Sequence, residues 1–331
     1  MTNKDSAKMR LNENLINGLT DLDGAVSSPP EWLVEALSVP REEGIVEVDG
    51  CDIHYFRWGD KSKPAILMLH GFLAHARCFA FIAPFLAKDY HIVAYDHSGM
   101  GDSGVRESYP EEVRVEEVMG VAEKTGLFEH AQKPTLVAHS FGGHVATATV
   151  RAHPDRFAGM VVCDLMILRP SVLAENAKSF SPPGSRNAGM PNRIYPDYES
   201  AKARFKLSPQ QAVEHEELFD YMAYHSLEQV EGGWVWKFDP SVFNREPGFE
   251  KKWLETAKNV ATAPGRKAIV YGEQSFLFNA DSVEYMHETI AQQGADDFPM
   301  IGIPYARHHL MLDQPIAFAT TLRAILSIWQ N

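Results

Sequence analysis

The stretch LVAHSFGGH, residues 136–144, joins an apolar run to two glycines through one serine, Ser140. The apolar run is typical of a buried strand, and the residues after the serine can begin a helix. A strand turns directly into a helix only where the two backbones nearly touch. Ala138 and Gly142, two residues to either side of Ser140, are small enough to allow this. The stretch therefore predicts a strand, a tight turn that carries the serine, and a helix.

Short runs rich in β-branched residues alternate with longer segments of helical period, which is the arrangement expected of a mainly parallel sheet. A hairpin is expected over residues 45–59, turning at Asp49-Gly50. Helices are expected near residues 30–37, 111–126 and 316–329. The expected core strands are residues 65–71, 91–96, 135–139, 160–164, 267–272 and 299–304.

One interval between strands is too long for an ordinary crossover. From residue 166 to residue 262 the chain is irregular, with helical period in its middle part, and a structureless loop of that size is improbable in a compact domain. We therefore expect a mainly helical cap over residues 166–262. The expected core comprises residues 45–165 and 263–331, and residues 1–44 form an N-terminal extension.

Composition excludes several classes of protein. The chain of 331 residues carries 31 Lys and Arg against 44 Asp and Glu, a net charge of −13 that would repel nucleic acid. No apolar stretch is long enough to insert into a membrane, and the N-terminal residues resemble neither a secretory nor a transit peptide. Three separated cysteines favour neither disulfides nor a metal site. We expect a cytoplasmic protein that needs no cofactor or metal and takes a small-molecule substrate; a homodimer is left open.

Four motifs occur in a familiar order: LMLHGF after one strand, YDHSGMGDSG after the next, AHSFGG at the turn and ARHHLMLDQP near the end. Together they resemble the α/β-hydrolase fold superfamily, in its serine-nucleophile branch, from about residue 45 to the C-terminus. The resemblance implies an α/β fold with a mostly parallel eight-stranded sheet flanked by helices. The turn departs from the G-x-S-x-G pattern of the family only in having Ala138 first.

The resemblance implies that Ser140 is the nucleophile and that a distant histidine is its base, held in the correct tautomer by an acid. Family members place this histidine four residues before an acidic side chain and a proline. Counting back from Asp313 selects His309, and His308 then occupies a position that is usually glycine. The resemblance also assigns the oxyanion hole to the backbone N–H groups of Phe72 and Phe141.

The acid has two candidates. The usual family position after the seventh strand is Ser275 in GEQS, which is not an acid. Some branches take the acid from the end of the preceding strand, where this chain has Asp164. We therefore expect Asp164 to orient His309, and Glu273 is the alternative.

The leading function is hydrolysis of carboxylic esters or lactones with an apolar or aromatic group. One alternative is a hydrolase that cleaves a C–C bond in ring-fission products; another, of a different class, is a catalytically weak binding protein on the same fold. Arg169, Arg186 and Arg193 are candidates to meet a substrate carboxylate. The residues expected to line the pocket are Met166, Arg169, Trp234, Trp236 and His308.

Overall fold

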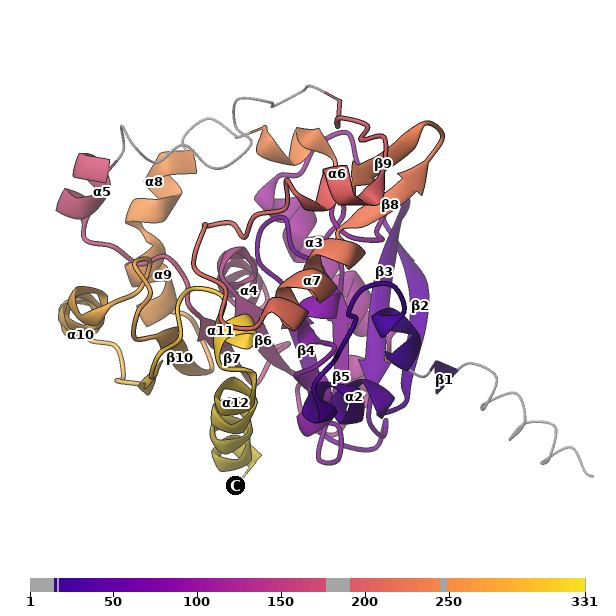
Figure 1. The fold of residues 1–331 in the computed structure, drawn as a ribbon. Coiled ribbons are helices and arrows are strands. Elements are labelled where there is room, and N and C mark those ends of the chain that lie inside the picture. Colours follow the sequence, from indigo (N-terminus) through magenta and orange to yellow (C-terminus); the bar gives the residue numbers. More distant parts are fainter. Residues whose placement is uncertain (1–14, 17, 177–190, 245–248, 331) are drawn as a thin grey trace, which may run out of the picture.

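The computed structural model describes residues 15–16, 18–176, 191–244 and 249–330, and its centre is one mostly parallel sheet (Figure 1). The strands follow the order β1-β2-β3-β5-β4-β6-β7-β10-β11. The strand β1 is a two-residue edge strand, so the remaining eight match the predicted number. The strands from β5 to β11 in this order pair in parallel, and β1, β2 and β3 pair antiparallel. Their bounds are β1 Leu15–Ile16, β2 Arg41–Val48, β3 Cys51–Trp58, β4 Ala65–Leu69, β5 His91–Tyr95, β6 Thr135–His139, β7 Gly159–Cys163, β10 Arg266–Gly272 and β11 Met300–Ile303.

The predicted hairpin is β2 and β3. Asp49 and Gly50 connect the two strands with φ angles of 47° and 73°. Positive φ at both central residues is the geometry of the tight turn that matches the twist of paired strands, and Asp-Gly is among the pairs that adopt it most readily. The pattern predicted this hairpin correctly.

Helices cover both faces of the sheet, as the alternation of residues in β4 shows. Ile66 and Met68 belong to one buried cluster together with side chains of α2 and α12, whereas Leu67 and Leu69 belong to a second cluster with side chains of α3, α4 and α10. Both faces of the sheet are therefore buried, which explains the continuous apolar strands. The helices are α2 Glu31–Ser38, α3 Glu111–Lys124, α4 Phe141–Ala152, α10 Ala280–Gln293, α11 Leu310–Asp313 and α12 Pro315–Gln330. None of the described helices combines the length and the apolar character that crossing a lipid bilayer requires.

The chain between β7 and β10, here called the insertion, carries several short helices and one hairpin. In Figure 1 the elements α6, β8 and β9 lie together at the top of the molecule. The hairpin was not expected from the sequence, although Gly232 and Gly233, both with positive φ, lie where β8 turns into β9. The elements of the insertion are α5 Pro170–Asn176, α6 Tyr198–Lys202, α7 Glu216–His225, β8 Leu227–Val230, β9 Gly233–Trp236, α8 Phe249–Leu254 and α9 Thr256–Ala261.

Candidate active site

Ser140 lies in a sharp turn between β6 and α4. Its φ of 51° and ψ of −117° are unusual for a residue with a side chain, and such strain is retained where the surroundings hold it. The helix passes so close to β4 that a Cβ on Gly142 would lie 2.6 Å from the carbonyl oxygen of Leu69. Only glycine fits there. Among the described residues, none accepts or donates a hydrogen bond at the Ser140 hydroxyl, and the side chain is half-buried.

Asp164 follows β7 directly and is fully buried, with a φ of 48°. One carboxylate oxygen lies 2.8 Å from Nδ1 of His308 and accepts a hydrogen bond of 2.6 Å from the Ser275 hydroxyl. The other accepts the backbone N–H of Gly272 at 2.8 Å. Because an ionised carboxylate can only accept hydrogen bonds, Nδ1 of His308 carries the proton, and Nε2 is then free to act as an acceptor.

The expectation that Asp164 orients His309 is wrong, because the histidine that contacts Asp164 is His308. The ring of His309 donates instead to the carbonyl of Pro209, in the insertion, at 3.3 Å. Burial, together with the neighbouring His308 and His139, holds the pKa of His309 well below its usual value. His309 is therefore a neutral ring on the insertion side of the loop.

The cause of this correction is the packing of the loop before α11. A Cβ on Gly272 would lie 2.4 Å from the carbonyl oxygen of Arg307, so the loop rests directly on the end of β10. Asp313 bends the loop further, because its carboxylate accepts the backbone N–H of Arg307 at 2.6 Å. In this position the side chain that meets the strand ends is that of residue 308, and counting back from Asp313 selects the wrong neighbour.

His308 lies beside the turn that carries Ser140. The ring of His139, the residue before the serine, donates from Nε2 to the backbone carbonyl of His308 at 2.8 Å, and the two rings are 4.8 Å apart. No described residue forms a hydrogen bond with Nε2 of His308. The structure thus brings Ser140, His308 and Asp164 to the same edge of the sheet, where the carboxyl ends of β6 and β7 meet the loop before α11.

Two backbone N–H groups beside the serine have no acceptor among the described residues. Phe141 is the first residue of α4, and the N–H at such a position has no partner within the helix. Phe72 lies against it, with the two rings 5.7 Å apart. The loop that carries Phe72 is held by His70, whose Nε2 accepts the N–H of His97 at 3.0 Å and whose Nδ1 contacts the carbonyl of Gly71 at 2.7 Å.

Glu273, the alternative acid, is exposed, and no described histidine forms a hydrogen bond or ion pair with it. Ser275, at the usual acid position of the family, supports Asp164 through its hydroxyl. The residue at that position therefore contacts the histidine only indirectly, through its hydrogen bond to Asp164.

An open cavity of about 570 Å³ adjoins this edge and is lined by the core and the insertion. Phe72, His139 and His309 line it from the core, and Phe205, Trp236 and Phe243 from the insertion. His75 and Ser226 also face it, joined by a hydrogen bond of 3.1 Å, and no pattern in the sequence marked either residue.

Of the residues expected to line the pocket, Trp236 lies on this cavity and four others do not. Met166 is buried in the core, and His308 is turned toward Asp164. The ring of Trp234 packs on Tyr198. Arg169 donates hydrogen bonds to Asp281 and Glu288 of α10 at 2.7 and 2.6 Å, so its positive charge is neutralised there. Arg186 lies outside the described residues.

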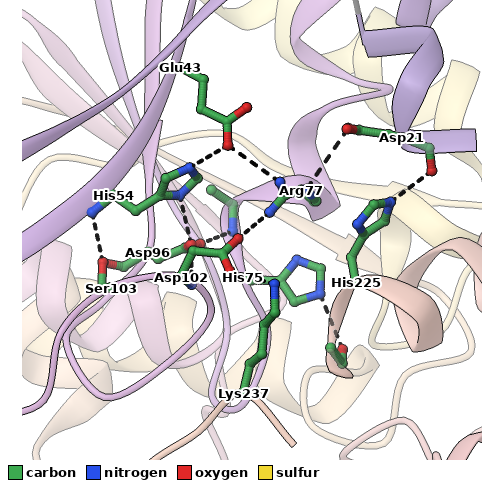
Figure 2. A network of polar contacts seen from close by, with 12 residues as sticks. Asp21, Glu43, His54, His75, Arg77, Asp96, Asp102, Ser103, His225 and Lys237 are labelled. Carbon is green, nitrogen blue, oxygen red and sulfur yellow. Dashed lines mark hydrogen bonds and ion pairs between the residues drawn. The ribbon is translucent and has the colours of Figure 1, made fainter. Parts of the chain in front are cut away.

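A buried polar network connects the N-terminal segment, the core and the insertion (Figure 2). At its centre, Arg77 forms ion pairs with Glu43 and Asp102. Asp102 also holds Lys237 of the insertion. The carboxylate of Asp21 bonds Arg41 of β2 at 2.7 Å, and its backbone carbonyl accepts from His225 of α7 at 2.8 Å. Ion pairs and hydrogen bonds thus tie the insertion to the core.

His54, Asp96 and Asp102 in this network bring potential metal-ligand atoms within 4.8 Å of one another. Protein groups already satisfy these atoms, however. Both ring nitrogens of His54 bond carboxylates, and Asp96 accepts the backbone N–H groups of Ala76 and Asp102 at 2.6 and 2.8 Å. Nearby cations neutralise the charge. The cluster fits a structural network better than a metal site.

Comparison with known proteins agrees with the fold. Residues 66–321 match the model of the alpha/beta hydrolase family, and the chain belongs to that family. It is 24% identical over 271 residues to monoacylglycerol lipase ABHD6 of Bos taurus, which covers 78% of this chain and 74% of that protein. It is 26% identical over 133 residues to epoxide hydrolase 4 of Mus musculus, which covers 39% of this chain and 35% of that protein.

Among solved structures, E-2-(acetamidomethylene)succinate hydrolase superposes with a TM-score of 0.69 at 17% identity, covering 87% of this chain and 99% of that one. At such identity the likeness shows the fold alone. Several curated relatives are matched over only 34–41% of their own length. The protein is thus an alpha/beta hydrolase, in a family whose relatives include proteins named lipases and epoxide hydrolases.

Proposed function

We propose that this protein hydrolyses carboxylic esters or lactones through an acyl-enzyme on Ser140, with His308 as the base and Asp164 as the residue that orients it. The observation that carries the proposal is the buried pair of His308 and Asp164 at 2.8 Å, beside the strained turn that presents Ser140. A serine alone is a weak nucleophile and needs an oriented base within reach.

The roles follow from the protonation of His308. With its Nδ1–H held by Asp164, Nε2 accepts the hydroxyl proton of Ser140 as the oxygen attacks the ester carbonyl. The contact between Nε2 and the hydroxyl is part of the proposal, and such contacts often tighten only when substrate is bound. The backbone N–H groups of Phe72 and Phe141 stabilise the negative oxygen of the tetrahedral intermediate.

The remaining steps use the same residues in reverse. His308 returns its proton to the leaving alcohol as the C–O bond breaks, which leaves the acyl group on Ser140. A water molecule then gives a proton to His308 and attacks the acyl carbonyl, and the carboxylic acid departs as Ser140 recovers its proton. No cofactor takes part in this sequence. The insertion acts as the cap over the substrate, and residues 45–165 and 263–331 form the core.

The name of epoxide hydrolase 4 implies epoxide opening, for which an aspartate nucleophile is suited. Residue 140 of this chain is a serine, which favours acyl transfer instead. The relative ABHD6 is named a monoacylglycerol lipase, an ester hydrolase. A C–C hydrolase and a binding protein on this fold remain the alternatives, and substrate turnover separates both from the proposal.

The test is Ser140→Ala, assayed with p-nitrophenyl esters of graded acyl length, with lactones and with a ring-fission dienoate. We expect kcat on esters to fall by roughly 10³-fold or more with an unchanged melting temperature. A fluorophosphonate probe should label the wild type and the control Ser208→Ala, but not Ser140→Ala. Wild-type turnover in folded Ser140→Ala contradicts the mechanism. Labelling of Ser140 without any turnover identifies a binding protein, and turnover of the dienoate alone identifies a C–C hydrolase.

A further inference from the structure

The charge of the cavity is opposite to the charge of the protein. The whole chain has a net charge of −13, yet Arg193, Arg204, Lys206 and Lys237 line the cavity. Among the described residues that line it, none is an aspartate or a glutamate. A concave site lined by one sign of charge attracts ligands of the other sign.

Three of these cations have no acidic partner in the part of the chain that the structure describes. No described carboxylate lies within ion-pair distance of Arg193, Arg204 or Lys206, and the guanidinium of Arg193 lies over the ring of Tyr195 at 5.2 Å. Lys237 differs, because Asp102 holds its ammonium group. Two other arginines show the contrast: Arg169 bonds three acidic residues of α10, and Arg307 bonds Glu214.

The basic residues share the cavity with the apolar groups next to Ser140. Phe72, beside the serine, packs edge-on against Phe243 of the insertion at 5.5 Å, and Phe205 stacks on Trp236 at 5.9 Å. All four rings line the cavity. A ligand that fills it meets aromatic walls and unpaired positive charges at once.

Resting on the proposed function, we propose that the substrates are esters with an apolar body and an anionic group, a carboxylate or a phosphate, which binds to Arg193, Arg204 and Lys206. Each of these side chains is exposed, so each adds only modestly to the affinity for the anionic group. Salt screens the charges and weakens this attraction. Planar guanidinium groups suit both carboxylate and phosphate oxygens, because they donate two parallel hydrogen bonds.

The test compares three substrates of one chain length: the mono-p-nitrophenyl ester of octanedioic acid, its methyl-capped neutral form, and p-nitrophenyl 8-phosphonooxyoctanoate. We expect the wild type to prefer an anionic substrate over the neutral one by about tenfold in kcat/KM at low salt, mainly through KM, and less at high salt. The anionic substrate with the higher kcat/KM shows whether these residues bind a carboxylate or a phosphate.

The variant Arg193→Gln/Arg204→Gln/Lys206→Gln should lose this preference, because its kcat/KM should fall by about tenfold on the anionic substrates and much less on the neutral ester. The matched control, Lys63→Gln/Lys133→Gln/Arg323→Gln, removes the same charge from exposed sites elsewhere and should keep the preference. Equal rates on all three substrates in the wild type, or an equal loss in both triple variants, overturn the inference.

Failure of the inference is distinguishable from failure of the proposed function. If the neutral ester is hydrolysed through Ser140 without any preference for an anion, only the inference fails. If no ester is hydrolysed, the proposed function fails, and the binding of an anionic ester to the cavity then tests the inference. Monomethyl octanedioate should then raise the melting temperature of the wild type more than that of the pocket variant, and equal shifts overturn it.

Discussion

Two histidine–aspartate pairs in this molecule share a geometry and differ in one contact. His308 and Asp164 lie at the candidate active site with Nδ1 and Oδ1 2.8 Å apart. His54 and Asp96 lie in the buried network with Nδ1 and Oδ2 2.9 Å apart (Figure 2). In both pairs the aspartate accepts backbone or hydroxyl hydrogen bonds as well, and all four side chains are buried.

The difference is at the second ring nitrogen. Nε2 of His54 bonds Glu43 at 2.8 Å, whereas no described residue bonds Nε2 of His308. Burial alone would lower the pKa of His54, but hydrogen bonds to Asp96 and Glu43 raise it to about 9. A histidine between two carboxylates stays protonated and serves as a structural cation. A histidine with one carboxylate keeps a nitrogen that can accept a proton, which a catalytic base requires.

The largest expected effect comes from removing the ring of His308. His308→Ala should lower kcat on a p-nitrophenyl ester by roughly 10³-fold or more, because the serine then has no base. The matched variant His309→Ala should lose less than about tenfold, since the ring of His309 contacts Pro209 and not Asp164. Both variants are compared at equal folded fraction, judged by melting temperature. A larger loss in His309→Ala would restore His309 as the base.

The next effect concerns the charge of Asp164. Asp164→Asn keeps the shape of the side chain but removes the charge that stabilises the protonated ring, so kcat should fall by roughly 10²- to 10⁴-fold. Glu273→Gln, the control at the alternative acid, should be nearly silent. The pH profile of kcat also tests the role, because its acidic limb, where the base must lose its proton, should move in Asp164→Asn and stay in place in Glu273→Gln. The reverse outcome would place the acid after β10.

Positions that backbone topology determines could be predicted from the sequence. The hairpin at Asp49-Gly50, the strands of the sheet and the turn at Ser140 each depend on local patterns that the folded chain preserves. Asp164 could be chosen as the acid candidate because it directly follows an apolar strand, and Ser275 offered no carboxylate. These features depend on the ends of strands, which parallel pairing brings to one edge.

The choice between His308 and His309 could not be made from spacing. It depends on how closely the loop approaches Gly272, a contact between residues far apart in the sequence. The cavity was hard to predict for the same reason. The sequence does not distinguish Arg169 from Arg193. In the structure, acidic residues of α10 pair with Arg169, whereas Arg193 lines the cavity. Side-chain partners across the insertion depend on tertiary packing, which no local pattern records.

The smallest effect concerns stability, and it tests the protonated state of His54. A folded-state pKa of about 9 against the ordinary histidine value of 6.5 means that the folded protein holds the proton more tightly than the unfolded chain. The stabilisation is therefore complete below about pH 6.5 and is lost as pH rises through 9. The shift corresponds to at most about 3 kcal/mol, of which about 2 kcal/mol should disappear between pH 6 and pH 8.5.

Urea unfolding at pH 6, 7 and 8.5 measures this loss in the free energy of unfolding. At pH 8.5 the cysteine thiols begin to ionise in the unfolded chain, and because burial raises their pKa values in the folded protein, they add a loss of stability of the same sign. Buried histidines of lowered pKa, such as His75 and His139, act in the opposite sense, because the unfolded chain loses their protons near pH 6.5 and the folded state gains stability there. The test is therefore the difference in stability between the wild type and a variant that alters the contacts of His54, in which these contributions cancel.

Glu43→Gln removes one of the two carboxylates at His54 and leaves the other histidines and the cysteines in place, so the free energy by which the wild type is more stable than this variant should shrink from pH 6 to pH 8.5. A difference in stability between the wild type and Glu43→Gln that stays constant from pH 6 to 8.5 would mean that His54 is neutral, and the contrast with His308 would then rest on geometry alone.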